Sequence, residues 1–184
     1  MGVYFNSAGD YTEQVLNVVQ DFLKTNDTIK EVVVATTTGK TALEFARKIS
    51  DVQIIAVSHQ AGFRERGQME ISTEKINSLK KLGAKVVTAT HALAGVDRAI
   101  RKQLGTWAIS ELIAQTLRIF GQGTKVCAEI ALMAADAGVL SMEDIIAVGG
   151  TNRGADTAWV ISPAHTHNFF DLKMKRLLCK PLEF

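Results

Sequence analysis

Short runs of consecutive apolar residues, separated by longer segments with helical periodicity, are the sequence feature that most restricts the fold. The runs Val32–Ala35, Ile54–Val57 and Ile145–Val148 contain no polar residue. A strand that is apolar at every position is buried on both faces, which is typical of a parallel sheet between two layers of helices. The weaker run Ala84–Ala89 and the run Ala158–Ile161 predict two further strands.

The two ends of the chain give weaker signals. Val3–Phe5 predicts an additional strand near the N-terminus. Near the other end, Phe170–Lys175 alternates between apolar and charged residues, which predicts an edge strand with a lysine face in water. A short amphipathic helix fits the same pattern, so both alternatives stay open for this segment.

Apolar residues between the runs recur every three or four positions, as they do along one face of an α-helix. The predicted helices cover Val15–Leu23, Ala42–Ile49, Ile76–Leu82, Ile109–Phe120 and Val126–Ala137. Ser72 is a good N-cap for the third helix, and Gly83 is a good stop. The alternation of strands and helices predicts an α/β fold, a three-layer sandwich with a mostly parallel sheet.

Length and composition restrict the functional class. The 184 residues fit one domain, residues 1–184, and the 47% hydrophobic and 22% charged residues are those of an ordinary globular protein. The net charge of +2 is too small to favour nucleic acid or a membrane surface as a partner. Two cysteines, Cys127 and Cys179, cannot form a disulfide framework, and no apolar run approaches the ~20 residues of a membrane span. We therefore expect a cytoplasmic protein whose partner is a small molecule.

Polar residues follow each of the central predicted strands. The four segments are Thr36–Thr41, Ser58–Phe63, Thr90–His91 and Gly149–Gly154. In an open α/β sheet, the carboxyl ends of parallel strands lie along one edge, where ligands bind. We therefore expect these hydroxyls, glycines and imidazoles to converge on one site.

The segment Thr36–Thr41 is the sharpest motif in the chain. Its threonines and Gly39 form a turn between a strand and the start of a helix, where free backbone N–H groups and the helix dipole favour an anion such as phosphate. Lys40 supports this, because a cation in the first turn of a helix is unfavourable unless an anion lies nearby. Alternatively, the threonines cap the helix and Lys40 points to water. The segment is not a Walker A loop, since Val34 occupies the position of the leading glycine.

His59 and His91 follow neighbouring predicted strands and are the candidate catalytic residues, since histidine exchanges protons near neutral pH. Structural hydrogen bonding is the alternative role for both. In Gly149–Thr157, glycines allow a ligand to approach the backbone closely, although an ordinary turn has the same composition. We predict no metal site, because His165 and His167 have no cysteine or carboxylate beside them in the sequence.

Aromatic residues and one cysteine add weaker indications. Phe5, Phe63, Trp107 and Trp159 are candidates for a slot that holds a planar ligand, and core packing is the alternative for all four. Cys127 lies on an apolar helical face and is predicted to be a small, buried hydrophobic residue.

Five segments together resemble a known family. They are Ala35–Ala42, Ser58–Glu65, Ser110–Gly123, Lys125–Gly138, and Gly149–Thr151 together with Gly154–Ala158. Through them, essentially the whole chain is similar to small, largely archaeal, functionally uncharacterised proteins described as pyruvate kinase α/β-domain-like. The resemblance implies the pyruvate kinase C-terminal fold and a bound flavin mononucleotide (FMN), whose phosphate is held by Thr36–Thr41. It does not imply pyruvate kinase activity, because the chain has no segment long enough for that enzyme's catalytic barrel.

The strand ends and the resemblance together give one set of candidate ligand-binding residues. The set is Thr36, Thr37, Thr38, Gly39, Lys40, Thr41, Ser58, His59, Gln60, Gly62, Phe63, His91, Gly149, Gly150, Thr151, Asp156 and Thr157. Two functions stay open for them. The first is a flavoprotein with FMN as cofactor and an oxidoreductase activity in which His59 or His91 moves a proton. The second is a non-catalytic sensor or regulatory module that binds a phosphorylated metabolite. In either case we expect a homo-oligomer, since symmetric homo-oligomers are common.

Overall fold

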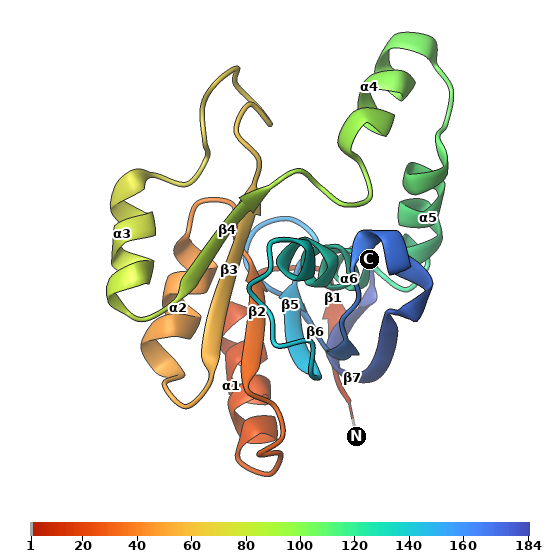
Figure 1. The fold of residues 1–184 in the computed structure, drawn as a ribbon. Helices are drawn as coiled ribbons and strands as arrows, with labels where there is room; N and C mark the ends of the chain where they lie inside the picture. The colour runs from red at the N-terminus through yellow and green to blue at the C-terminus, as the bar shows by residue number, and fades with distance from the viewer. Residues whose placement is uncertain (1) are drawn as a thin grey trace.

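The computed structural model describes residues 2–184, which form a seven-stranded sheet with helices on both faces (Figure 1). The strands are β1 (Val3–Ser7), β2 (Glu31–Ala35), β3 (Gln53–His59), β4 (Lys85–Ala89), β5 (Ile145–Gly149), β6 (Thr157–Ser162) and β7 (Lys173–Glu183). The helices are α1 (Thr12–Leu23), α2 (Lys40–Lys48), α3 (Thr73–Lys81), α4 (Gly95–Leu104), α5 (Ile109–Arg118), α6 (Gln122–Asp136) and the short 3₁₀ helix η1 (Thr166–Asp171). The α/β fold class expected from the sequence is confirmed.

The sheet has the strand order β1-β7-β6-β5-β2-β3-β4. Strands β5, β2, β3 and β4 pair in parallel, with Val33 of β2 opposite Ile55 on one side and Ala147 on the other. Within residues 2–184, β6 is the strand that runs antiparallel to both of its neighbours. The fully apolar runs of the sequence are therefore the central strands β2, β3 and β5, which are covered on both faces.

Each face of the sheet has its own apolar core. Val32 and Val34 of β2 face α1 and α2, whereas Val33 between them faces α6. Leu16 of α1 and Phe45 of α2 are fully buried. Burial of a side chain of this size stabilises the fold by roughly 1.5–3 kcal/mol. Helix α6 is rich in alanine because it packs between the sheet and α5, which leaves little room for side chains.

The C-terminal segment differs from the prediction. Phe170–Lys175 is divided between η1 and β7, and β7 is not an edge strand, because it lies between β1 and β6. Strand β1 takes the edge instead and pairs in parallel with β7, with Val3 opposite Cys179. The alternation of apolar and charged residues indicates which side of a strand faces solvent. It carries no information about which strands become neighbours.

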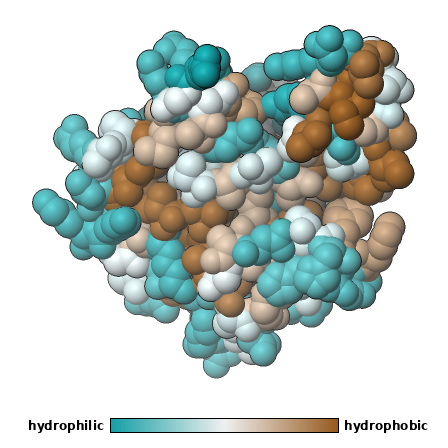
Figure 2. Space-filling view, turned by 45° about the horizontal axis from the view of Figure 1, so that its top comes forward, coloured by the Kyte–Doolittle hydropathy of each residue, from teal (hydrophilic) through white to brown (hydrophobic). Residues whose placement is uncertain are grey.

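Helix α4 has no counterpart in the predicted helices. None of its residues is buried, so the helix packs no apolar face into a core, and such a face is the signal by which helices are found in a sequence. Figure 2 shows apolar surface over α4 and α5, where Val96, Leu104 and Ile109 are exposed. In contrast, the predicted cap of α3 is confirmed, since the Oγ of Ser72 accepts a hydrogen bond from the backbone N–H of Lys75 at 3.3 Å.

Membrane insertion through a helix has no support in residues 2–184. None of the helices there is both long enough and apolar enough to cross a membrane.

Candidate functional site

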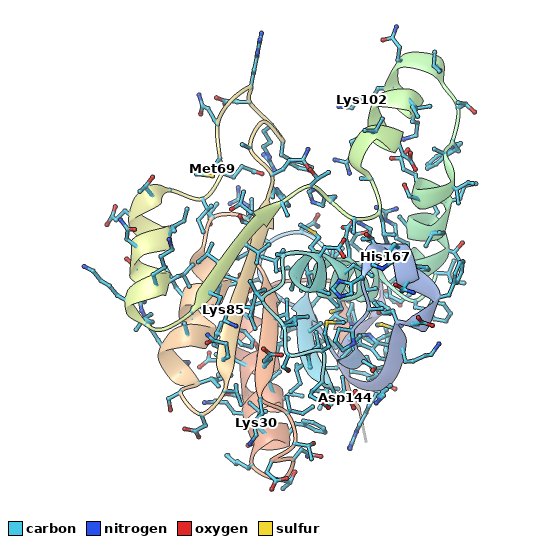
Figure 3. All side chains as sticks on the ribbon, viewed as in Figure 1. Lys30, Met69, Lys85, Lys102, Asp144 and His167 are labelled. Carbon is cyan, nitrogen blue, oxygen red and sulfur yellow. The ribbon has the colours of Figure 1, made fainter. Side chains whose placement is uncertain are left out.

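A cavity of about 590 Å³ lies at the carboxyl ends of β2, β3, β4 and β5, where the sequence predicts a site. The segment after β1, the loop after β3 and one side of α6 complete its wall. Small-molecule sites have volumes of roughly 300–1,000 Å³. In Figure 3, the loop with Met69 and the helix with Lys102 project beyond this edge of the sheet, whereas Lys30 and Asp144 lie at the opposite edge.

The turn between β2 and α2 forms one end of the cavity. The backbone N–H of Thr36 donates to the carbonyl of Val57 at 2.9 Å, so the turn starts as a continuation of the sheet. Gly39 then directs the chain into α2 with a φ of +87° and is the N-cap residue of that helix. Because glycine has no side chain to cap the first turn, the backbone N–H groups and the positive end of the helix dipole remain available to an anion.

Thr36 gives the sharpest indication that the cavity holds a ligand. The residue is 6% exposed, and its Oγ1 has no hydrogen-bond partner among residues 2–184. A buried hydroxyl left without a partner costs about 1–3 kcal/mol. Thr36 lines the cavity together with Thr37, Thr38 and Thr41. A ligand oxygen in front of α2 would remove this cost.

Lys40 and Asp10 supply charges of opposite sign near this turn. Lys40 lines the cavity, and its Nζ lies 4.0 Å from the carboxylate of Glu44, a loose contact at an exposed site. The Oδ1 of Asp10 accepts hydrogen bonds from the Oγ1 of Thr12 at 2.6 Å and from its backbone N–H at 3.2 Å. These bonds from Thr12 lower the pKa of Asp10, although burial opposes them, so its carboxylate is ionised at neutral pH. The position of Asp10 just after the weakly predicted strand β1 was the signal that could have identified it.

Three rings at the ends of β3 and β4 pack together. The ring of His59 lies 4.2 Å from that of Phe63 and 5.0 Å from that of His91, and the rings of Phe63 and His91 lie 4.9 Å apart, between centroids. We call these residues the His–Phe–His group. The guanidinium of Arg98 lies 5.1 Å from the centroid of the Phe63 ring. The group offers π-faces and imidazole nitrogens beside the cavity, a combination suited to a planar heterocycle.

Glu70 orients His59. Its Oε2 lies 2.5 Å from the Nδ1 of His59, and its Oε1 forms an ion pair with the Nε of Arg64 at 2.9 Å. With Nδ1–H donating to the carboxylate, the Nε2 of a neutral His59 ring is a hydrogen-bond and proton acceptor. Glu70 and Arg64 line the cavity but were not predicted, because they come from the loop beyond β3 and not from the strand end itself.

Burial lowers the pKa of His91 to about 4. The negative charge of Glu129 opposes this shift, and His59, Lys125 and Arg98 add to it. His91 is therefore neutral at pH 7, and its ring can both donate and accept one hydrogen bond.

A buried ion pair on α6 supports this part of the wall. Glu129 lines the cavity, pairs with Lys125 one turn earlier, and accepts a hydrogen bond from the backbone N–H of Leu93 at 3.0 Å. The two charged side chains are only 4–5% exposed, and burial lowers the pKa of Lys125 while Glu129 opposes that shift. Removal of one partner from such a pair costs about 3–5 kcal/mol. This ion pair was not predicted from the sequence. A lysine and a glutamate four positions apart in a mainly apolar helix are the sequence signal that could have revealed it.

Gly149, Asp156 and Thr157 form the framework of the turn between β5 and β6. A side chain at Gly149 would lie 2.7 Å from the carbonyl of Gly123, so glycine here allows α6 to approach the sheet. The Oδ2 of Asp156 accepts hydrogen bonds from the Oγ1 of Thr151 at 2.6 Å and from its N–H at 3.0 Å, and Oδ1 accepts from the Oγ1 of Thr157 at 2.7 Å. These bonds hold Thr151 at the cavity.

The cavity brings together ten of the predicted ligand residues. They are Thr36, Thr37, Thr38, Lys40, Thr41, Ser58, His59, His91, Gly150 and Thr151. The predicted residues that do not line it are Gly39, Gln60, Gly62, Phe63, Gly149, Asp156 and Thr157. The polar lining residues that were not predicted are Asp10, Arg64, Glu70, Gln122, Glu129, Asn152 and Arg153. The roles assigned to the predicted residues remain predictions.

The other singled-out aromatic residues and cysteines lie in varied surroundings. Phe5 is in the core, stacked on Tyr11 with ring centroids 4.2 Å apart. Trp159 packs beside the second core and donates a hydrogen bond to the Oγ1 of Thr124 at 3.1 Å. Trp107 is 46% exposed. Cys127 is fully buried, as predicted.

The His165–His167 pair has a neighbour that the sequence did not place there. The Nδ1 of His165 lies 3.3 Å from a carboxylate oxygen of Asp136, and the two imidazole rings stack with centroids 5.6 Å apart. Across the described part of the chain, no three side chains of the metal-binding types gather into a possible site.

The family model described as "Pyruvate kinase, alpha/beta domain" matches residues 15–161. The chain belongs to the pyruvate kinase α/β-domain family. The matched range contains β2 to β5, α2 and α6, and with them every lining residue of the cavity apart from Asp10. The cavity is therefore built almost entirely from the part of the chain that this family shares.

Three solved structures resemble the fold at low sequence identity. NH3-dependent NAD synthetase from Campylobacter jejuni subsp. jejuni NCTC 11168, in complex with the nitrate ion, is 14% identical with a TM-score of 0.40, over 77% of this chain and 56% of that chain. O-ureido-L-serine synthase is 14% identical with a TM-score of 0.33, over 70% and 48%. NAD+ synthetase from Burkholderia pseudomallei is 16% identical with a TM-score of 0.34, over 79% and 58%. The chain spans about half the length of these proteins, and likeness at this level supports no argument about function.

Proposed function

We propose that the cavity binds FMN, with the phosphate in front of α2 and the flavin ring beside the His–Phe–His group. The observation that carries this proposal is that Thr36, a residue of the cavity wall, has a buried Oγ1 without a partner among the described residues. A phosphate oxygen would accept its hydrogen bond.

Three kinds of group support the position proposed for the phosphate. The first turn of α2 offers backbone N–H groups, the threonines offer hydroxyls, and Lys40 offers a positive charge. Asp10 also lines the cavity and is ionised, so it repels an anion placed near it. We therefore place the phosphate at the α2 side and the uncharged ribityl hydroxyls toward Asp10.

Aromatic rings and hydrogen-bonding imidazoles support the position proposed for the flavin ring. The residues proposed to hold the ring are His59, Phe63 and His91, and a neutral His91 can donate to or accept from its heteroatoms. When bound, FMN would supply redox chemistry, and the protein would supply binding, orientation and electrostatics. The hydrogen bond from His59 to Glu70 fixes which ring nitrogen can take a proton, which suits an oxidoreductase.

A second function fits the phosphate end equally well. The features around α2 select a phosphate group and not a flavin, so a sensor that binds another phosphorylated metabolite would have the same turn. The two proposals differ in what lies beside the His–Phe–His group.

The first experiment identifies the ligand. Freshly purified protein is mildly denatured, and the absorbance spectrum and mass of the released molecule are measured. FMN supports the flavoprotein, whereas a sugar phosphate or another phosphorylated metabolite supports the sensor.

The second experiment tests the phosphate site. FMN and riboflavin, which lacks the phosphate, are titrated into ligand-free protein, and flavin fluorescence is followed. We expect FMN to bind more tightly by about tenfold or more, the worth of hydrogen bonds to a charged group. Thr36→Val and Lys40→Ala should weaken FMN and leave riboflavin unchanged, while Lys48→Ala at the far end of α2 should change neither. Equal affinities for FMN and riboflavin would refute the site.

A further inference from the structure

A second, smaller cavity of about 80 Å³ lies between α4, α5 and α6. It shares no lining residue with the large cavity. Its volume is far below the roughly 300 Å³ at which small-molecule sites begin. The cavity can therefore take a small ion or one chemical group and cannot enclose a nucleotide.

The walls of this small cavity are strongly basic. Four cationic side chains line it, Arg98, Arg101, Arg118 and Lys125, together with one carboxylate, that of Glu111. The carboxylate is already used, because the Nε of Arg101 donates to Glu111 at 2.8 Å.

Lys125 is paired with Glu129, whose carboxylate belongs to the wall of the large cavity. Arg118 donates from Nε to the neutral side-chain oxygen of Gln122 at 2.7 Å, which leaves its charge uncompensated. Of the four cations, Arg98 and Arg118 thus have no carboxylate partner within residues 2–184.

Arg98 provides the independent indication of a ligand. Its Nε is buried and has no hydrogen-bond partner in the described chain. Its guanidinium lies over the ring of Phe63, a cation–π contact that satisfies no N–H group. A buried donor of a charged group without a partner costs more than the 1–3 kcal/mol of a neutral one, as an order of magnitude.

The cations also repel one another. The positive charges of Arg98 and Arg118 both contribute to the lowered pKa of Lys125, after the larger effect of burial. The positive charges of Arg98, Arg118 and Lys125 around so small a space are a costly arrangement in a low-dielectric surrounding, and the attraction of each to an anion placed between them would offset their mutual repulsion.

We propose that the small cavity is a binding site for a phosphate group, held by Arg98 and Arg118 together with Lys125. Two uncompensated guanidiniums match the roughly two negative charges of phosphate better than the single charge of a carboxylate. The planar fork of arginine donates two parallel N–H bonds to adjacent phosphate oxygens, which accounts for the unused Nε of Arg98. The two cavities share no lining residue, although Arg98 lies over Phe63 of the His–Phe–His group, and the phosphate proposal does not depend on FMN binding.

The test is a titration of the isotope-labelled protein with inorganic phosphate, followed by NMR at constant ionic strength maintained with chloride. We expect saturable shifts of the Arg98 and Arg118 Nε–H signals and of the α4 and α5 amides. Because signals are assigned by residue, binding at the α2 turn is recorded separately. Arg118→Gln should weaken the α4–α5 response by about tenfold or more. Arg47→Gln, an exposed arginine at the end of α2, should leave it unchanged.

A second probe, glycerol 3-phosphate, distinguishes the two sources of the group. Equal binding identifies the site as one for phosphomonoesters, and binding of inorganic phosphate alone identifies it as one for the free ion. Either result supports the proposal. Shifts in α4 and α5 that do not saturate, or that are unchanged in a folded Arg118→Gln variant, would overturn it.

Discussion

Gly154 shows how one small residue determines the shape of the ligand-binding edge. It adopts a φ of +75°, and a β-carbon there would collide with the carboxylate of Asp10 and approach the Oγ1 of Thr12 at 2.8 Å. The same Oγ1 accepts a hydrogen bond from the backbone N–H of Ala155 at 3.0 Å. Glycine at this position therefore lets the β5–β6 turn close over the segment that follows β1.

We predict that Gly154→Ala destabilises the protein more than Gly67→Ala does. Gly67 has the same φ of +75° but open space where a β-carbon would be, so it carries only the left-handed cost of about 1–2 kcal/mol. Gly154→Ala adds the collision with Asp10. Denaturant unfolding of both variants measures the difference, and equal losses of stability would show that Asp10 moves away freely.

His91 makes the free energy of unfolding depend on pH. Its pKa falls from 6.5 to about 4 on folding, mainly through burial. Between these two values the unfolded chain binds a proton at His91 that the native protein does not bind. The free energy of unfolding contributed by this group is therefore unaffected above pH 6.5 and decreases as the pH falls toward 4.

We expect His91→Asn to reduce this dependence. The slope of unfolding free energy against pH, measured between pH 6.5 and 4, should be shallower in the variant than in the unchanged protein. An identical slope in both proteins would mean that the pKa of His91 is the same in the native protein as in the unfolded chain.

At the scale of elements, α4 and α6 stand at opposite extremes. Helix α6 is buried along most of its length and packs on the sheet, whereas α4 has no buried residue and packs mainly on α5. Sequence periodicity identified α6 because its apolar side chains meet a core. It missed α4 because a helix without a buried face needs no apolar stripe in its sequence.

Hydrogen exchange should separate the two helices. We predict that the amides of α4 exchange through local opening at a small free-energy cost, while those of α6 exchange near the global unfolding free energy. Exchange measured by mass spectrometry on peptides from 95–104 and 122–136 checks this. Saturating phosphate should slow exchange in α4 if the small cavity binds it. Equal protection of the two helices without phosphate would contradict the prediction.

At the scale of the whole molecule, the parallel strands bring several segments from different parts of the chain to one edge. The turn after β2, the end of β3, the segment after β4 and the β5–β6 turn all meet at the large cavity. Helix α6 connects this cavity to the small one, since Glu129 lines the first and its ion-pair partner Lys125 lines the second. The homo-oligomer expected from the sequence remains a prediction, and the exposed apolar residues of α4 and α5 are a surface at which to look for it.

The sequence by itself determined the central strands of the sheet and the edge at which the large cavity lies. Fully apolar runs are stable only where both faces are covered, and parallel strands place their carboxyl ends together, so Thr36, His59 and His91 could be assigned to one edge in advance.

Only the tertiary structure decided which residues from other elements complete the two cavities. Asp10 reaches the large one because β1 pairs with β7, and Glu129 reaches it because α6 packs close to Gly149. Arg98 and Arg118 meet because α4 and α5 fold over the start of α6. Such contacts depend on pairings between distant segments, and local patterns of hydrophobicity and turn residues carry no record of them.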